Sequence, residues 1–187
     1  MFAIRAAKKA NLSGAAWASM VAVSFLALFT FPNATFGEEL RIGDFQILLP
    51  DGYVHLPKQS KADADHWQNK DGTGVTIDVL SHKPMSVDQE KWAIEKWRNY
   101  GRTEMVAVAV RHGDFTMPIR EETLASGAVL MSVADQQQAS GKVRFGLFFL
   151  LIGPDARLAQ IVVEGPGLAS DRLREFRPVV DSARWAN

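Results

Sequence analysis

Residues 143–152 (VRFGLFFLLI) constrain the fold of this chain most, because their pattern predicts a strand that is apolar on both faces. Alternate side chains of a strand point to opposite faces of its sheet. One face would carry Phe145, Leu147, Phe149 and Leu151, and the other Phe148, Leu150 and Ile152. Such a strand must be covered on both sides, so we expect a central sheet between two other layers.

Turn signals divide the preceding part of the chain. Residues 44–53 predict a short strand closed by a Pro-Asp-Gly turn, in which glycine accepts a positive φ. Polar residues 56–65 predict a surface loop. Residues 66–82 predict a hairpin, because Asp71-Gly72 is a strong turn pair and apolar residues alternate after it. This also explains Gly72-Thr73-Gly74, which lacks the spacing of a phosphate-binding loop.

Residues 103–164 predict a series of strands separated by polar turns. The expected turns lie at residues 112–114, 135–142 and 153–156. The last of these joins residues 143–152 to the strand at 157–165, so we expect these two strands to be neighbours.

Two segments predict amphipathic helices. The first starts at Ser86, which forms a capping box with Gln89, and stops at Gly101. Its apolar face comprises Ala93, Ile94, Trp97 and Tyr100. The second begins at Ser170 and is kinked or split by Pro178. Its buried stripe comprises Leu173, Phe176, Val180 and Ala183. Together with the strands, these helices predict an α+β fold, an antiparallel sheet flanked by helices in an α/β/α sandwich.

The order of these pieces resembles the PsbP/Mog-type fold superfamily, which includes DcrB-like bacterial envelope proteins. The resemblance covers residues 40–186. It rests on the strand ending LPDGY, the hairpin WQNKDGTGVTIDVL, the helix DQEKWAIEKWRNYG, and the strand AQIVVEGPG leading into LREFRPVVDSARW. It implies a non-catalytic accessory or binding role, such as stabilising a photosystem assembly, binding a small GTPase or chaperoning secreted effectors. The superfamily shares no catalytic motif, so no functional residue is transferred.

The N-terminus predicts export. Arg5, Lys8 and Lys9 precede 17 residues without charge, residues 15–31, and the first acids follow at Glu38. A basic start, an apolar core and a small-residue exit are typical of a secretory signal peptide. We expect residues 1–37 to be this signal, with cleavage after Gly37 or after Ala34, and residues 38–187 to be a single domain. The alternative is that residues 12–31 remain as an anchor in the inner membrane.

Either alternative places the domain outside the cytoplasm, periplasmic or secreted. Export is a departure from the cytosolic members of the superfamily, and it weighs against binding a GTPase there. The chain has no cysteine, which excludes a lipid-modified cysteine like that of the DcrB lipoproteins, a thiol enzyme and a cysteine metal site. Without residues 1–37 it keeps 18 basic residues (21 minus 3) against 21 acids, which argues against a nucleic-acid partner.

The histidines offer few candidates for chemistry. They are His55, His66, His82 and His112, and the densest polar cluster is Asp63, Asp65 and His66. A metal site needs three or four converging ligands, so we expect a solvated loop there, no metal and no cofactor. No G-x-S-x-G motif is present. An envelope hydrolase remains the alternative function, and it would need His55 or His66 beside Asp63 or Asp65 in a pocket.

Glu121 and Glu122 do not predict a catalytic carboxylate pair. They are adjacent on a predicted strand, so their side chains should point to opposite faces.

Tryptophan supplies the candidate binding residues. Trp97 and Trp185 fit the apolar stripes. Trp67 and Trp92 lie outside them, and each is either an exposed anchor for a partner or a packed residue. The sequence thus predicts an exported, non-catalytic protein that binds another envelope or secreted protein as an accessory subunit, a chaperone or an immunity-type protein. Contact with the membrane is expected only if the N-terminal segment is retained.

Overall fold

The computed structural model describes residues 36–57, 64–81, 86–105, 107 and 115–186, all within the unit Ala34–Asn187. The predicted export signal lies outside this part, except for Phe36 and Gly37, which begin strand β1. Among the described residues, no helix is long and apolar enough to cross a membrane.

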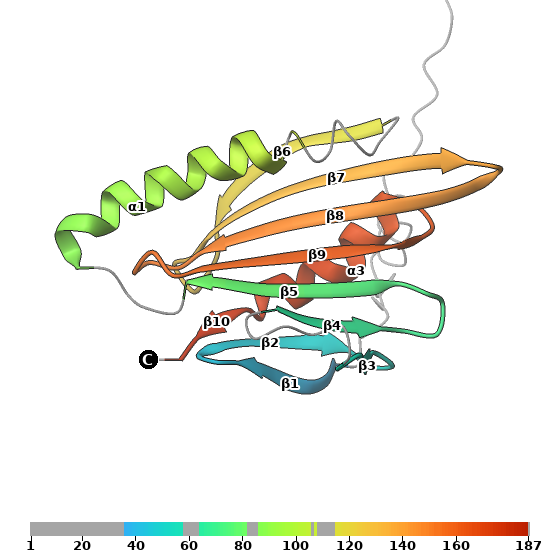
Figure 1. Ribbon diagram of the computed structural model, residues 1–187, viewed down its shortest axis with the longest axis horizontal. Coiled ribbons are helices and arrows are strands. Elements are labelled where there is room, and N and C mark those ends of the chain that lie inside the picture. Colours follow the sequence, from blue (N-terminus) through green and yellow to red (C-terminus); the bar gives the residue numbers. More distant parts are fainter. Residues whose placement is uncertain (1–35, 58–63, 82–85, 106, 108–114, 187) are drawn as a thin grey trace, which may run out of the picture. The chain divides into compact units, whose positions relative to one another are not determined.

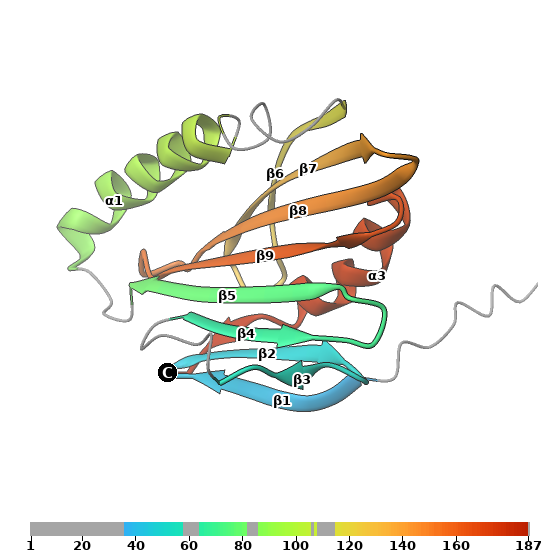
Figure 2. The same cartoon turned by 45° about the vertical axis from the view of Figure 1, so that its right-hand side comes forward.

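The centre of the fold is a seven-stranded antiparallel sheet with the strand order β3-β4-β5-β9-β8-β7-β6. Figures 1 and 2 show β4, β5, β9, β8 and β7 side by side. They are β3 (Val54–His55), β4 (Ala64–Gln68), β5 (Gly74–Ser81), β6 (Phe115–Thr123), β7 (Val129–Ala139), β8 (Lys142–Ile152) and β9 (Leu158–Pro166). A smaller sheet consists of β1 (Phe36–Ile42), β2 (Phe45–Pro50) and β10 (Arg184–Trp185), in the order β1-β2-β10.

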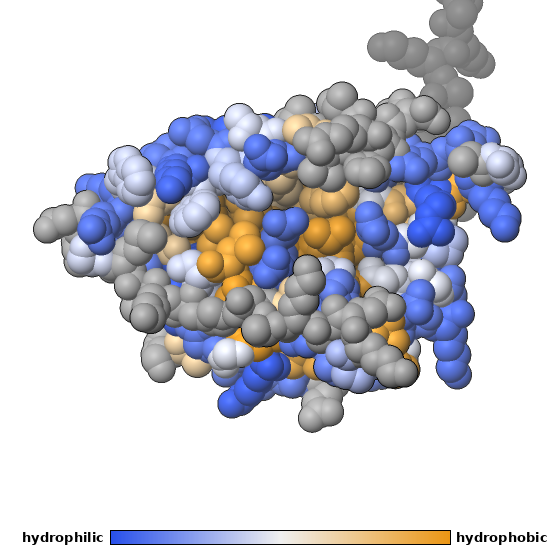
Figure 3. All heavy atoms as spheres, viewed as in Figure 1, coloured by the Kyte–Doolittle hydropathy of each residue, from blue (hydrophilic) through white to orange (hydrophobic). Residues whose placement is uncertain are grey.

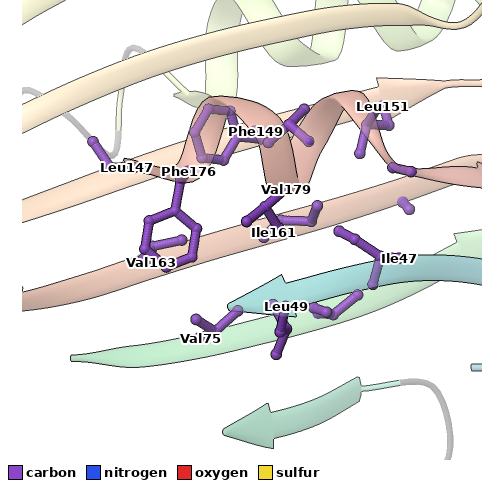
Figure 4. Packing of buried hydrophobic residues seen from close by; sticks show 14 of the residues in the cluster. Ile47, Leu49, Val75, Leu147, Phe149, Leu151, Ile161, Val163, Phe176 and Val179 are labelled. Carbon is purple, nitrogen blue, oxygen red and sulfur yellow. The ribbon is translucent and has the colours of Figure 1, made fainter. Parts of the chain in front are cut away.

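Strand β8 lies between β9 and β7, and every residue from 145 to 152 is buried. On one face, Phe149 packs in a core that includes Phe176 of helix α3 (Ala169–Asp181) and Ile47 of the small sheet (Figure 4). On the other face, Phe148 packs in a second core, which helix α1 (Val87–Tyr100) contacts through Ile94 and Trp97. The predicted α+β fold and the two-sided burial of this strand are therefore confirmed.

The predicted turn and hairpin signals hold over most of the chain. The hairpin of β4 and β5 turns at Asp71-Gly72, where Gly72 has a φ of 86°. The β8–β9 turn closes through a bond from the N–H of Gly153 to the carbonyl of Arg157 at 2.8 Å. The predicted loop at 56–65 is too long, because β4 already begins at Ala64. The turn predicted at 112–114 lies outside the described residues.

The predicted turn at residues 135–142 is wrong, because β7 continues to Ala139 and only Ser140 and Gly141 form the turn. Both have positive φ, 53° and 75°, as in the tight two-residue turns that suit hairpin twist. The polar residues mark a hairpin tip: pairing with β6 ends at Gln136 and pairing with β9 ends at Arg144. Past these positions the described ladder pairs β7 with β8 alone, and Gln137 and Gln138 lie in this part.

The first helix begins at the predicted residue but without the predicted capping box, and the second begins earlier than predicted. Ser86 is the N-cap of α1, but its side chain makes no capping bond, and the N–H of Gln89 bonds to the Ser86 carbonyl at 2.9 Å. Helix α3 has Leu168 rather than Ser170 as its N-cap. The side chain of Gln136 accepts a hydrogen bond from the Ala169 N–H at 3.2 Å, which allows the first turn to start early.

Pro178 neither splits α3 nor ends it. The helix runs to Asp181, with Pro178 exposed in its last turn. The N–H of Ser182 bonds to the carbonyl of Pro178 at 3.1 Å and so closes the turn that follows. Phe176, Val180 and Ala183 are buried as predicted, and Leu173 is partly buried.

Gly101 does not stop the first helix. Its φ is −57°, and the chain continues into a π-helical turn, η1 (Gly101–Met105), in a region where strand had been predicted. Packing is tight around Gly101: a Cβ would lie 2.7 Å from Sδ of Met131 and 3.0 Å from Cδ2 of Leu150, so these side chains would have to shift.

We expect Gly101→Ala to lower the free energy of unfolding by about 1–2 kcal/mol, because crowding of Met131 and Leu150 outweighs the better helix propensity of alanine. Urea unfolding followed by circular dichroism measures this. Gly74→Ala is the matched control, because its Cβ would meet nothing closer than the Trp67 carbonyl oxygen at 3.9 Å. Wild-type stability of the Gly101 variant would contradict the packing explanation.

Candidate functional site

Trp92 is the most exposed of the large hydrophobic side chains described, at 66%. It lies on α1, whose Ala93 faces the sheet and is buried. Nζ of Lys96 lies 5.2 Å from the centroid of the Trp92 ring and 5.4 Å from that of Trp97. These distances allow cation–π attraction, which favours one orientation of Trp92. The outer face of α1 thus presents a large aromatic side chain to solvent.

The other tryptophans pack. Trp67 is only 7% exposed and belongs to the main core. Trp185 contacts Phe45 edge to face, with ring centroids 5.2 Å apart, and Trp97 packs on the second core. Of the two candidate anchors, the structure therefore leaves Trp92 as the one with an accessible ring, and a partner contact of Trp92 stays a prediction.

The structure places His55 beside Asp65, which is one of the pairs that the hydrolase alternative needs. Nε2 of His55 lies 3.0 Å from Oδ1 of Asp65, beside a hollow of about 330 Å³ that Tyr53 and Trp67 also line. Nδ1 of His66 instead lies 2.9 Å from Oγ1 of Thr76. In β4, His66 points to the opposite face from its neighbour Asp65.

The hollow beside His55 lacks an activated nucleophile among its described lining residues. Its one hydroxyl-bearing side chain is Tyr53. Burial raises the pKa of this phenol far above its usual value, and the carboxylate of Glu175 raises it further, so it stays protonated. Among the described residues, no group of His, Asp and Glu is arranged to hold a metal ion. Asp63, His82 and His112 lie outside those residues.

Glu121 and Glu122 point to opposite faces of β6, as predicted. Glu121 pairs with Nε of Arg98 at 2.9 Å and with Arg102 at 2.8 Å, both from the α1–η1 segment. Glu122 pairs with Arg177 of α3 at 2.7 Å. These carboxylates therefore link the two helices to the same edge strand, which is a structural role.

A second candidate region was not predicted from the sequence: a polar hollow on the large sheet. One part has a volume of about 370 Å³ and is lined by residues of β4, β5, β8 and β9, including His66 and Thr76. An adjoining part of about 180 Å³ is lined by residues of β7, β8 and β9, including Asp135 and Gln137. Arg144 and Glu164 line both parts.

This hollow lies on the same sheet face as α1. Along β8, the side chains on that face change from Ile152, Leu150 and Phe148, which pack in the second core, to Gly146 and Arg144. In Figure 3, hydrophobic side chains gather in the middle of the face beside α1, and hydrophilic ones predominate toward the ends of β4–β5 and β7–β8 on the right. That change from apolar to polar along alternate residues is the signal in the sequence that could have located the hollow.

Asp135 lies at the floor of the hollow and is only 3% exposed. It is paired with Gly146 across β7 and β8, and a Cβ at Gly146 would collide with its Oδ1. Glycine at 146 therefore makes the space in which this carboxylate lies over the neighbouring strand.

Comparison with known proteins gives likenesses of fold. No protein-family model matches the sequence, and no curated protein sequence matches it significantly. Among solved structures, the Ran-binding protein Mog1p of Saccharomyces cerevisiae is 9% identical and aligns over 80% of this chain and 95% of its own, with a TM-score of 0.46. A point mutant of Mog1 is 10% identical over 80% of this chain and 96% of its own, with a TM-score of 0.45.

A protein of Bacteroides thetaiotaomicron is also similar. It is 9% identical over 81% of this chain, with a TM-score of 0.51, and this chain spans about half of it, 49%. At such identities the likeness concerns the fold alone. The fold is shared with proteins of differing length, so function must be argued from the surfaces described above.

Proposed function

We propose that this protein is an exported, non-catalytic binding protein of the cell envelope, which acts by contacting another envelope or secreted protein as an accessory subunit, chaperone or immunity-type protein. The observation that carries the proposal is the exposed indole of Trp92 on α1, with Lys96 over its ring at 5.2 Å. Tryptophan is enriched among residues that dominate binding energy, because it supplies a large contact area from a side chain with few rotatable bonds.

The remaining candidate chemistry supports binding over catalysis. The His55–Asp65 pair orients an imidazole but has no activated hydroxyl beside it among the described residues. His66 is engaged with Thr76 and points to the other face of the sheet.

Export rests on the basic and apolar pattern of residues 1–37. Strand β1 begins at Phe36, where it pairs with Pro50. Cleavage after Ala34 would leave this strand complete, whereas cleavage after Gly37 would remove its first two residues. We therefore propose Thr35 as the first residue of the mature protein, located in the periplasm or secreted.

The experiment is an affinity purification of the C-terminally tagged, full-length protein from its own envelope fraction, with the intact mass of the bait measured in parallel. Wild type, Trp92→Ala and Val54→Ala are compared. Val54 is a matched control, because it is also an exposed apolar residue, at 65%, but lies on the edge strand β3. We expect one stoichiometric protein with wild type and the Val54 variant, and its loss with the Trp92 variant.

Each readout tests one part of the proposal. A bait mass that begins at Thr35 supports export and the proposed cleavage site, and a mass that includes residues 1–34 contradicts processing. Equal capture by the Trp92 variant contradicts the α1 surface as the binding site. If the wild-type bait is processed but no second protein is purified with it, the result contradicts action through protein contacts.

A further inference from the structure

The polar hollow holds two opposite charges that do not meet. Arg144 pairs with Pro166 across β8 and β9, and Glu164 pairs with Gly146, so Arg144 and Glu164 are diagonal neighbours on one face. Diagonal side chains start about 7–8 Å apart, which is within reach of two long side chains. Within the described part of the chain, however, neither residue forms an ion pair, and both border the same open space.

This arrangement is unusual for the molecule. Arginine side chains of the described residues are otherwise paired with carboxylates, with the exception of Arg120. Examples are Arg157 with Asp44 and Asp155, Arg172 with Asp71 and Glu175, and Arg177 with Glu122 and Asp181. Arg144 is thus a cation available to a ligand, next to an available anion.

We propose that this hollow binds a small zwitterion, namely a free amino acid or a short peptide with free termini. A guanidinium can donate two parallel hydrogen bonds to one carboxylate, which assigns the ligand carboxylate to Arg144. Glu164 then accepts a hydrogen bond from the ligand ammonium.

Other simple ligand classes fit the charges less well. An anion would face the carboxylate of Glu164, and a cation would face the guanidinium of Arg144. The larger part of the hollow, about 370 Å³, is within the size range of small-molecule sites. It is also lined by Gln68, whose side-chain amide is a hydrogen-bond donor and acceptor suited to a peptide group. The site is distinct from the Trp92 surface, so it does not depend on the proposed protein partner.

The test is an NMR titration of the purified, naturally processed protein with the dipeptide alanyl-alanine up to about 10 mM. The same titration uses its N-acetylated and its C-amidated forms. We expect wild type to bind the free dipeptide at the hollow and to bind each capped form at least about tenfold more weakly, because each cap removes one charge-assisted contact.

Variants assign the contacts. Glu164→Gln should bind the free dipeptide about tenfold more weakly than wild type, and N-acetylation of the dipeptide should then cause no further loss of affinity. Arg144→Gln should likewise bind the free dipeptide about tenfold more weakly, and C-amidation should then cause no further loss. Arg120→Gln is the matched control, because Arg120 also has no ion pair with a described residue but lies on β6, which does not line the hollow. Three results would each overturn the proposal: no shifts at the hollow with any dipeptide, equal binding of free and capped forms, or the same loss of affinity in the Arg120 variant.

Discussion

Replacing Phe149 with alanine is expected to lower the free energy of unfolding by about 3–5 kcal/mol. Phe149 is 2% exposed and packs in the core that also contains Ile161 of β9 and Phe176 of α3 (Figure 4). Truncation to alanine removes this apolar contact and leaves a cavity that helix and sheet cannot fully close. The unfolding midpoint in urea, followed by circular dichroism, measures the loss.

The same unfolding experiment on an alanine variant of Phe148 tests whether β8 is buried on both faces. It points to the opposite face, is 7% exposed and packs in the second core with Leu150 and Met131. We expect Phe148→Ala to cost about 3 kcal/mol as well. Leu168→Ala is the control, because this exposed leucine should cost less than about 0.5 kcal/mol. A loss below about 1 kcal/mol for either phenylalanine would mean that one face of β8 is not covered.

Arg157→Ala is the second change with a large expected effect. One guanidinium nitrogen of Arg157 bonds to Asp44 at 2.7 Å and to the carbonyl of Ala186 at 2.9 Å, and the other lies 2.6 Å from Asp155. Its guanidinium also lies over the Trp185 ring, 5.9 Å from the centroid. Arg157 therefore holds the β1–β2 turn, the β8–β9 turn and strand β10 together.

Burial alone would lower the pKa of Arg157, but its hydrogen bonds to Asp155 and Asp44 outweigh burial and raise the pKa. The guanidinium is thus charged at neutral pH. Its removal leaves two partly buried carboxylates without their cation, and we expect a loss of about 2–3 kcal/mol.

Arg174→Ala is the control for Arg157→Ala. Its pair with Asp171 at 3.2 Å is largely exposed, so its loss should cost less than about 1 kcal/mol. Thermal unfolding of the two variants compares these effects directly. Equal stability of the two variants would show that the Arg157 contacts do not hold β10 in place.

The pattern of apolar residues and turns was sufficient to predict the central strand β8 and one of its neighbours, β9. Residues 145–152 alternate large side chains on both faces, and only a covered strand in mid-sheet accommodates them. The opposite orientation of Glu121 and Glu122 followed from the same alternation, because side-chain direction in a strand is fixed by the backbone.

Features that depend on distant residues could not be predicted. The start of α3 depends on the side chain of Gln136, and Gly101 on Met131 and Leu150, none of which is a sequence neighbour. Gln137 and Gln138 resemble loop residues because they lie where β7 still pairs with β8 but, among the described residues, no longer with β6.

The candidate sites likewise combine features that the local sequence predicts with features that depend on distant residues. The sequence singled out Trp67 and Trp92, but burial of Trp67 results from its pairing with Val75 and its contacts with the core of the large sheet. The polar hollow brings together β7, β8 and β9, and the register that places Arg144 diagonally from Glu164 is a property of the folded sheet.

The most direct test of the central claim is the dissociation constant of the purified complex with the captured partner, measured by isothermal titration calorimetry for wild type, Trp92→Ala and Val54→Ala. A residue that anchors an interface costs at least about 2 kcal/mol when truncated, so we expect the Trp92 variant to bind at least about 30-fold more weakly. The Val54 variant should match wild type. Equal affinity of all three proteins would contradict a binding function for the outer face of α1.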